Sequence, residues 1–140
     1  MIVDANVLLY ARNADDPSHD RARRWLESAL NGEARVGLPW LSLSAFYRIA
    51  TNPRALQHPL SPASAADQIR AWRSAPRAWT PSAGAGFDEV FLDVLTKHEV
   101  RGPLTTDALL AALARHHGVA VVSTDADFAR FDVQWINPLA

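Results

Sequence analysis

Residues 119–122 read Val-Ala-Val-Val, a continuous apolar run near the end of the chain. A strand without polar alternation is typical of a sheet that helices cover on both faces, and such sheets are mainly parallel. The chain begins with a shorter run of the same kind, Ile2 and Val3. Segments with helical periodicity alternate with short apolar stretches between these two runs. This order predicts an α/β fold, a sandwich in which helices flank a mainly parallel sheet.

The remaining elements follow from periodicity and from Pro, Gly and Asn at segment ends. Ser18 is positioned to cap the second helix, and Asn31-Gly32 predicts a left-handed end to it. The third helix is expected to bury a stripe made of Leu43, Phe46, Tyr47 and Ala50. Strands are expected at 1–3, 35–38, 77–80, 119–122 and 132–136, and helices at 6–12, 18–30, 39–50, 61–74, 87–95 and 105–114.

Length and composition limit the class of protein. The 140 residues favour one domain spanning 1–140, with a formal net charge of −1 that gives no global basic field. The chain has no Cys, which excludes disulfides and thiolate metal sites. No apolar run approaches the roughly 20 residues of a membrane span, and the N-terminus has no basic region typical of a signal peptide. We therefore expect no membrane association and a cytoplasmic location.

Acidic residues recur at the ends of apolar elements. Asp4 follows the first strand, Asp107 lies at the start of the buried helix, and Asp125 and Asp127 follow the run at 119–122. Each acid alone has an ordinary structural explanation. Asp4 can cap a helix, Asp107 can favour the helix dipole, and the other two can be turn residues.

The four acids together indicate more than each one does alone. If the first strand and the strand at 119–122 are neighbours, their carboxyl ends bring Asp4 close to Asp125. Carboxylates that converge repel one another unless a hard divalent cation neutralises them, and carboxylates with water suit Mg²⁺ or Mn²⁺. Such a cation can act on a phosphodiester. Supporting polar groups are expected from Asn6, Thr106 and Thr124.

Other candidate residues have weaker support. Arg48, off the apolar stripe of the third helix, can contact a nucleic-acid phosphate or pair with an acid of the site, and a solvated surface position explains it equally well. Arg12 can join a basic rim for a nucleic-acid backbone, although an ordinary solvated helix face is favoured. Trp25 and Trp40 are expected in core positions, and His116-His117 is an ordinary helix end.

Several stretches resemble the PIN-domain ribonucleases, specifically the VapC toxins of bacterial toxin–antitoxin pairs. The matching segments span nearly the whole chain in their order and spacing. They are Met-Ile-Val-Asp-Ala-Asn-Val-Leu-Leu-Tyr at 1–10, Leu-Ser-Ala-Phe-Tyr-Arg-Ile-Ala-Thr-Asn-Pro-Arg at 43–54, Thr-Thr-Asp-Ala-Leu-Leu-Ala-Ala-Leu-Ala at 105–114, Ser-Thr-Asp-Ala-Asp-Phe-Ala-Arg-Phe at 123–131 and Trp-Ile-Asn-Pro-Leu at 135–139.

The resemblance implies a PIN-like α/β/α sandwich and a Mg²⁺-dependent endoribonuclease. It also implies a homodimer, a cognate antitoxin that inserts a segment into the active-site groove, and transfer RNA or ribosomal RNA as the substrate. By position, Asp4, Asp107 and Asp125 match the first, third and fourth acids of the family, and Asp127 matches an auxiliary acid. We therefore expect Asp4, Asp107 and Asp125 to be catalytic and all four acids to serve the metal.

One departure from the family pattern concerns the third helix. The family places an acid there, at a position that falls near Ala45, but residues 34–66 contain neither Asp nor Glu. The VapC group that the middle stretch resembles shares this gap. The prediction is therefore a three-acid site with one Mg²⁺ held by Asp4 and Asp107, with Asp125 acting through water. Asp88, Glu89 or an additional water are considered as replacements for the missing acid.

Two other functions compete with the nuclease. A non-catalytic PIN module that binds RNA or a protein partner is suggested by the missing acid, although the presence of Asp4, Asp107 and Asp125 together argues against it. A phosphatase of the haloacid dehalogenase type would require a second Asp where this chain has Asn6, and a catalytic Lys. The lone Lys97 lies outside any matching context.

Overall fold

A computed structural model describes all 140 residues, and its centre is one sheet of five short parallel strands. The order across the sheet is β3-β2-β1-β4-β5, so the first strand lies beside the fourth. Every predicted strand is present, although each is shorter than the apolar pattern suggested. The strands are β1 (Ile2–Val3), β2 (Val36–Gly37), β3 (Ala78–Trp79), β4 (Val121–Val122) and β5 (Trp135–Ile136).

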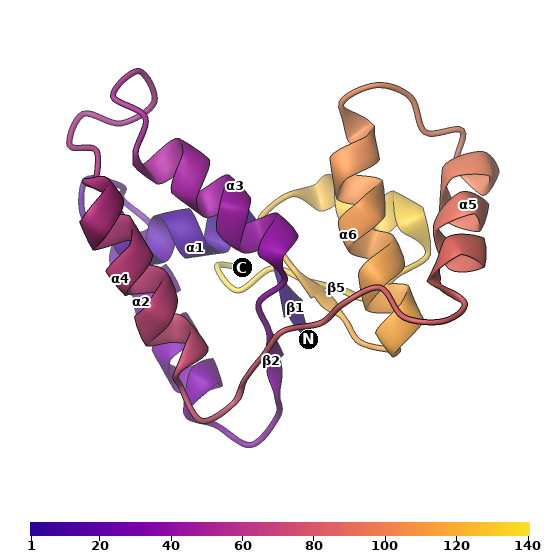
Figure 1. Cartoon of the computed structure of the whole chain (residues 1–140), viewed down its shortest axis with the longest axis horizontal. Helices are drawn as coiled ribbons and strands as arrows, with labels where there is room; N and C mark the ends of the chain where they lie inside the picture. The colour runs from indigo at the N-terminus through magenta and orange to yellow at the C-terminus, as the bar shows by residue number, and fades with distance from the viewer.

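Helices cover both faces of the sheet, as Figure 1 shows. Four of them, α1 to α4, lie on one side, and α5, α6 and a short 3₁₀ helix, η1, lie on the other. The predicted α/β/α sandwich is therefore confirmed. The helices are α1 (Ala5–Arg12), α2 (His19–Leu30), α3 (Trp40–Ala50), α4 (Pro62–Arg73), α5 (Phe87–Lys97), α6 (Leu104–His117) and η1 (Ala126–Phe131).

The two hydrophobic cores meet at the central strands. Val3 and Val122 pack in the core with α1 to α4, whereas Ile2 and Val121 pack with α5 and α6. Successive residues of a strand point to opposite faces, so β1 and β4 each contribute one apolar side chain to each core. This is why the strands show no polar alternation. As predicted, α6 is largely buried, from Ala108 to Ala114 with one exception.

The ends of α2 differ from the prediction. Ser18 occupies the N-cap position, but its side chain makes no capping hydrogen bond. The expected left-handed end is also wrong, since Asn31 has a φ of −110° and Gly32 does not have a positive φ. Instead, the Asn31 side-chain amide donates a 2.8 Å hydrogen bond to the Glu27 carbonyl. A side chain thus completes the last turn, and no left-handed residue is needed.

Two aromatic residues expected in the core lie at the surface. Trp40 is 52% exposed and Tyr47 is 36% exposed. The buried stripe of α3 is narrower than predicted and contains Leu43, Phe46 and Ala50. Trp40 is the first residue of α3, where its ring is covered on one side by the Arg73 guanidinium, 4.7 Å from the ring centre. Trp25 is half-buried beside the core.

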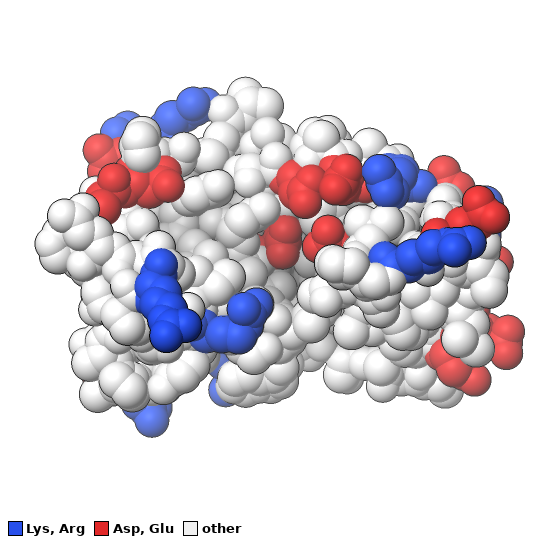
Figure 2. Space-filling view, turned by 90° about the horizontal axis from the view of Figure 1, so that it is seen from above, with Lys and Arg blue, Asp and Glu red and all other residues white.

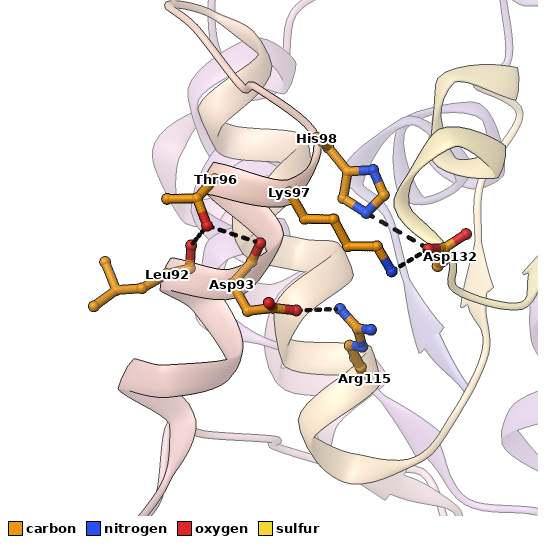
Figure 3. A network of polar contacts seen from close by, with 7 residues as sticks. All are labelled: Leu92, Asp93, Thr96, Lys97, His98, Arg115 and Asp132. Atoms are coloured by element: carbon orange, nitrogen blue, oxygen red, sulfur yellow. Dashed lines mark hydrogen bonds and ion pairs between the residues drawn. The ribbon is translucent and has the colours of Figure 1, made fainter.

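A polar network fastens α5 to α6 and to the end of η1 (Figure 3). Asp93 on α5 pairs with Arg115 on α6 at 3.3 Å, and Lys97 pairs with Asp132 at 2.8 Å. The hydrogen bond from Lys97, with its positive charge, lowers the pKa of Asp132. These contacts anchor the segment that follows β4. No helix in the structure combines the length and apolarity needed to cross a membrane.

Candidate active site

The site lies at the carboxyl edge of the sheet, outside β1 and β4. These strands pair in parallel, with Ile2 beside Val121 and Val3 beside Val122. The Asp4 backbone N–H then donates to the Val122 carbonyl at 2.9 Å. Helices leave β1 on one face and reach β4 from the other, an arrangement that opens a crevice at this edge in α/β sheets.

Ser123, the residue after β4, organises the polar contacts of this edge. It is fully buried, and its hydroxyl donates a 2.7 Å hydrogen bond to Oδ2 of Asp4. The Ser123 hydroxyl oxygen itself accepts hydrogen bonds from the Asn6 side-chain amide at 3.1 Å and from the Asp125 backbone N–H at 3.0 Å. The Trp135 indole N–H donates a 2.8 Å hydrogen bond to the Ser123 backbone carbonyl. Ser123 therefore links residues from both ends of the chain.

Asp4 has two structural roles. Its Oδ1 accepts a 2.8 Å hydrogen bond from the Ala5 backbone N–H, so it caps α1 as the local sequence allowed. Its Oδ2 faces Ser123. Burial raises the pKa of Asp4, the hydrogen bonds from Ser123 and Ala5 oppose that rise, and the charge of Asp125 adds to it. Hydrogen bonds thus fix the position of the Asp4 carboxylate, while its burial disfavours the charged form.

Three of the predicted acids converge. Carboxylate oxygens of Asp107, Asp125 and Asp127 lie within 4.8 Å of one another. Asp107 lies in the first turn of α6, whereas Asp125 and Asp127 belong to the start of η1. Figure 2 looks onto this side of the molecule and shows acidic side chains gathered near the middle of the face. Asp127, predicted as an auxiliary acid for the metal, belongs to this set, whereas Asp4 lies outside it.

Asp107 is the acid that this arrangement perturbs most. Burial is the largest cause and the charges of Asp4, Asp125 and Asp127 add to it, and together they raise its pKa to about 6. The charge of Asp4 therefore acts on the Asp107 carboxylate together with the charges of Asp125 and Asp127. Mutual repulsion of this kind is what a bound cation would relieve.

The charge around the cluster fits a divalent cation. Asp127 pairs with Arg130 at 3.5 Å, but Asp4, Asp107 and Asp125 form no ion pair with any Lys or Arg. Oxygen ligands from carboxylates match the preference of Mg²⁺ and Mn²⁺. The assignment of these acids as metal ligands stays a prediction.

A small cavity of about 30 Å³ adjoins the cluster on the side of α3. Asp4 and Asp107 line it, together with Thr106 from α6. Its α3 wall includes Ser42 and Ala45, so the slot where the family pattern has an acid does face the site. Asp88 and Glu89, considered as replacements, lie in the first turn of α5 and outside the cluster of converging carboxylates.

The other predicted residues lie as follows. Asn6 contacts Ser123 instead of an acid, and its Oδ1 accepts a 3.4 Å hydrogen bond from the Thr124 backbone N–H. Arg48 is exposed and forms no ion pair with an acid of the site. Arg12 lines a separate cavity of about 340 Å³ with Asp15 and His58. The RNA contacts of these two arginines stay predictions.

Sequence reasoning missed two residues of the site, Ser123 and Ser42. Ser123 immediately precedes Thr124-Asp125, and its place directly after an apolar strand was the signal that could have singled it out. Ser42 had no such signal. It lies in the first turn of a helix among apolar residues, and only the packing of α3 against Asp4 and Asp107 brings it to the cavity.

Comparison with known proteins identifies the fold and the family. The PIN domain family model matches residues 1–134. Ribonuclease VapC37 of Mycobacterium tuberculosis is 41% identical over 140 residues, covering 99% of this chain and 97% of its own. Ribonuclease VapC33 of the same organism is 40% identical over 140 residues, with 99% and 98% covered. The chain belongs to the PIN domain family and, within it, to the VapC group.

Solved structures agree on the fold. VapBC2 from Rickettsia felis, bound to a DNA fragment from its promoter, superposes with a TM-score of 0.71 at 16% identity, covering 97% of this chain and 96% of that one. Mycobacterium tuberculosis VapC20, described as a sarcin-ricin loop cleaving toxin, superposes with a TM-score of 0.69 at 22% identity, covering 94% and 95%. At these identities the likeness supports the fold alone.

Proposed function

We propose that this chain is an endoribonuclease that depends on a divalent cation, with Mg²⁺ as the working ion and Mn²⁺ as a substitute. The observation that carries the proposal is the convergence of Asp107, Asp125 and Asp127 carboxylates within 4.8 Å, beside Asp4. Relatives of about 40% identity over the full chain are named ribonucleases, which supports the same activity here. The whole of residues 1–140 forms the nuclease domain in this proposal.

The acids and the residues that support them have defined parts in the proposed mechanism. Asp4, Asp107, Asp125 and Asp127 would hold the cation at the carboxyl edge of the sheet. Ser123 fixes the Oδ2 atom of Asp4, and Asn6 fixes Ser123 in turn. When bound, the cation supplies the positive charge that activates water and stabilises the leaving oxygen.

The proposed reaction is hydrolysis of an RNA phosphodiester. The water oxygen forms a bond to phosphorus in line with the departing 3′ oxygen, the bond from phosphorus to that oxygen breaks, and a proton passes to it. The products carry a 5′-phosphate and a 3′-hydroxyl. Transfer RNA or ribosomal RNA is the proposed substrate, and Arg48 and Arg12 are candidates to contact its phosphates.

We also propose a protein partner. The chain is the toxin of a toxin–antitoxin pair, and a cognate antitoxin inhibits it. Structural neighbours are complexes such as VapBC2 from Rickettsia felis and VapBC-1 from nontypeable Haemophilus influenzae, which supports this assignment. A homodimer is the proposed assembly. Co-purification with the product of an adjacent small reading frame, and light scattering of the free chain, test these two points.

The activity is tested on purified protein with RNA, Mg²⁺ and EDTA. Asp4→Asn is the sharpest variant, because Asn keeps an acceptor for the Ala5 N–H that caps α1. Asp4→Asn and Asp107→Ala should abolish cleavage and growth inhibition while circular dichroism stays unchanged. Asp67→Ala, which removes an exposed acid of α4, is the control. Wild-type cleavage by both site variants would refute the assignment.

A non-catalytic PIN module that binds RNA or protein is the second candidate, because α3 brings Ala45 instead of a carboxylate to the site. This alternative expects RNA binding without cleavage at any divalent cation concentration. Sequencing of RNA 5′-phosphate ends after brief induction, with the Asp4→Asn chain as the reference, separates the two. New ends that depend on Asp4 support the nuclease and also identify the RNA that is cut.

A further inference from the structure

The first turn of α3 faces the Asp4 and Asp107 side of the site. Ser42 and Ala45 are three residues apart on α3, so they share one face of the helix. Both line the cavity of about 30 Å³ that Asp4 and Asp107 also line. Ala45 has no polar atom in its side chain. Ser42 is therefore the only residue of α3 that brings a polar side chain to this cavity.

The Ser42 hydroxyl has no hydrogen-bond partner within the protein. The residue is 2% exposed, and its Oγ is buried without a donor or acceptor in reach. A helical serine commonly bonds to the carbonyl of the preceding turn. Ser44, two residues on, does so with the Leu41 carbonyl at 3.2 Å. Buried hydroxyls are nearly always paired, so an unpaired one beside two carboxylates calls for a ligand.

The cavity has the size and chemistry for a water that a cation binds. A volume of about 30 Å³ exceeds the roughly 10–15 Å³ that one water requires. Its polar wall consists of Asp4, Asp107, Thr106 and Ser42. Two carboxylates bring the negative charge, and a hydroxyl adds a neutral hard oxygen of the kind that Mg²⁺ accepts.

We propose that Ser42 takes over the part of the absent α3 acid, so that its hydroxyl is the contact from α3 to the water shell of the divalent cation held beside Asp4 and Asp107. This inference rests on the proposed function, since it assumes that the acids bind a cation. It assigns Ser42 to the positioning of the ion and its water shell. The chain thereby keeps a polar contact on the third side of the site without adding a further negative charge.

The test compares Mn²⁺ affinity of the wild-type chain and two serine variants by titration calorimetry and by electron paramagnetic resonance of free Mn²⁺. Ser42→Ala should weaken Mn²⁺ binding about tenfold, which is the usual cost of removing a group that orients metal ligands. Ser44→Ala removes a hydroxyl from the exposed face of the same helix and should leave the affinity unchanged. An affinity of Ser42→Ala within about twofold of wild type overturns the proposal.

Thermal unfolding in EDTA separates metal contact from ordinary packing. Since the Ser42 hydroxyl makes no hydrogen bond in the protein, Ser42→Ala should unfold at the same or a higher temperature without metal. The stabilisation that Mn²⁺ adds should be smaller for Ser42→Ala than for wild type. A lower unfolding temperature in EDTA together with equal Mn²⁺ stabilisation would mean a structural role and would refute the inference.

Different outcomes refute the proposed function and the role of Ser42. A wild-type chain that binds no Mn²⁺ and cleaves no RNA would refute the proposed function and this inference with it. A wild-type chain that binds Mn²⁺ with an affinity that Ser42→Ala leaves intact would refute only the role of Ser42.

Discussion

The hydroxyl of Ser123 donates a 2.7 Å hydrogen bond to Oδ2 of Asp4, across 119 positions of sequence. The two residues follow neighbouring parallel strands, so their contact depends directly on the pairing of β1 with β4. Asn6 and the Asp125 backbone N–H donate to the same serine oxygen. One buried hydroxyl therefore sets the relative position of the first acid and the acids of η1.

Ser123→Ala should destabilise the chain and reduce cleavage. The change removes the only side-chain donor to Asp4 and leaves the Asn6 amide without its acceptor. Loss of a buried hydrogen bond to a charged group predicts a fall of about 1.5–3 kcal/mol in the free energy of unfolding at pH 7. Urea denaturation measures it, with Ser74→Ala, an exposed hydroxyl on a helix end, as the control. Equal stability of the two variants would contradict this role.

The metal-free chain should lose stability as pH rises from about 4 to about 6. The pKa of Asp107 is raised from 3.8 to about 6 in the folded chain, so the folded state keeps this proton longer than the unfolded state. Stability therefore declines between the two values and levels off above them. The raised pKa of Asp4 acts in the same direction. Urea denaturation in EDTA across this pH range measures how the free energy of unfolding changes with pH.

Asp107→Asn should remove most of that slope. At pH 7 in EDTA, we expect the variant to be more stable than wild type by about 1 kcal/mol, a value reduced for solvent screening of this partly exposed group. Saturating Mg²⁺ should narrow or reverse the difference, because the cation stabilises only the chain that keeps the carboxylate. Asp67→Asn is the control. A pH profile that Asp107→Asn leaves unchanged would show that the acids do not interact as described.

Ala45→Glu should increase Mn²⁺ affinity at least about tenfold, because it places a carboxylate on the α3 wall of the cavity. In that background, Ser42→Ala should have little further effect on affinity, since both residues serve the same side of the ion. Ser44→Glu adds the same charge to the exposed face of α3 and controls for long-range attraction. If Ser44→Glu raises the affinity as much as Ala45→Glu, the effect is one of net charge alone.

Gly37→Ala should destabilise the sheet. A Cβ at this position would lie 2.9 Å from Cγ1 of Ile2 and 3.0 Å from the Met1 carbonyl oxygen, closer than packed atoms tolerate. Overpacking of this kind costs about 1–3 kcal/mol of unfolding free energy. Gly84→Ala is the matched control, because its nearest neighbour would be His116 Nε2 at an ordinary 3.6 Å. Urea denaturation of both variants gives the comparison.

Much of the architecture could be predicted because periodicity is a local property. The apolar runs at both ends of the chain predicted strands covered on both faces, and the structure confirms them as neighbours. The buried α6 was evident from an apolar pattern with no polar face. The errors concern residues whose environment depends on distant elements, such as Trp40, which Arg73 of α4 partly covers at the surface.

The four acids could be predicted as one group, but the distances between them could not. Their positions at the ends of apolar elements indicated a common edge, and the structure places Asp107, Asp125 and Asp127 together and holds Asp4 on Ser123. Distances between side chains on separate elements follow from strand register and helix placement. Neither is encoded in the spacing of residues along the chain.

The sequence by itself determined the order of strands and helices and the kind of chemistry available, because apolar periodicity and acidic side chains are properties of short segments. Only the tertiary structure decided which groups meet. Ser123 reaches Asp4 because β4 pairs with β1, and Ser42 reaches the cavity because α3 lies beside Asp4 and the first turn of α6. Contacts across such sequence distances depend on the packing of the whole core, which no local pattern specifies.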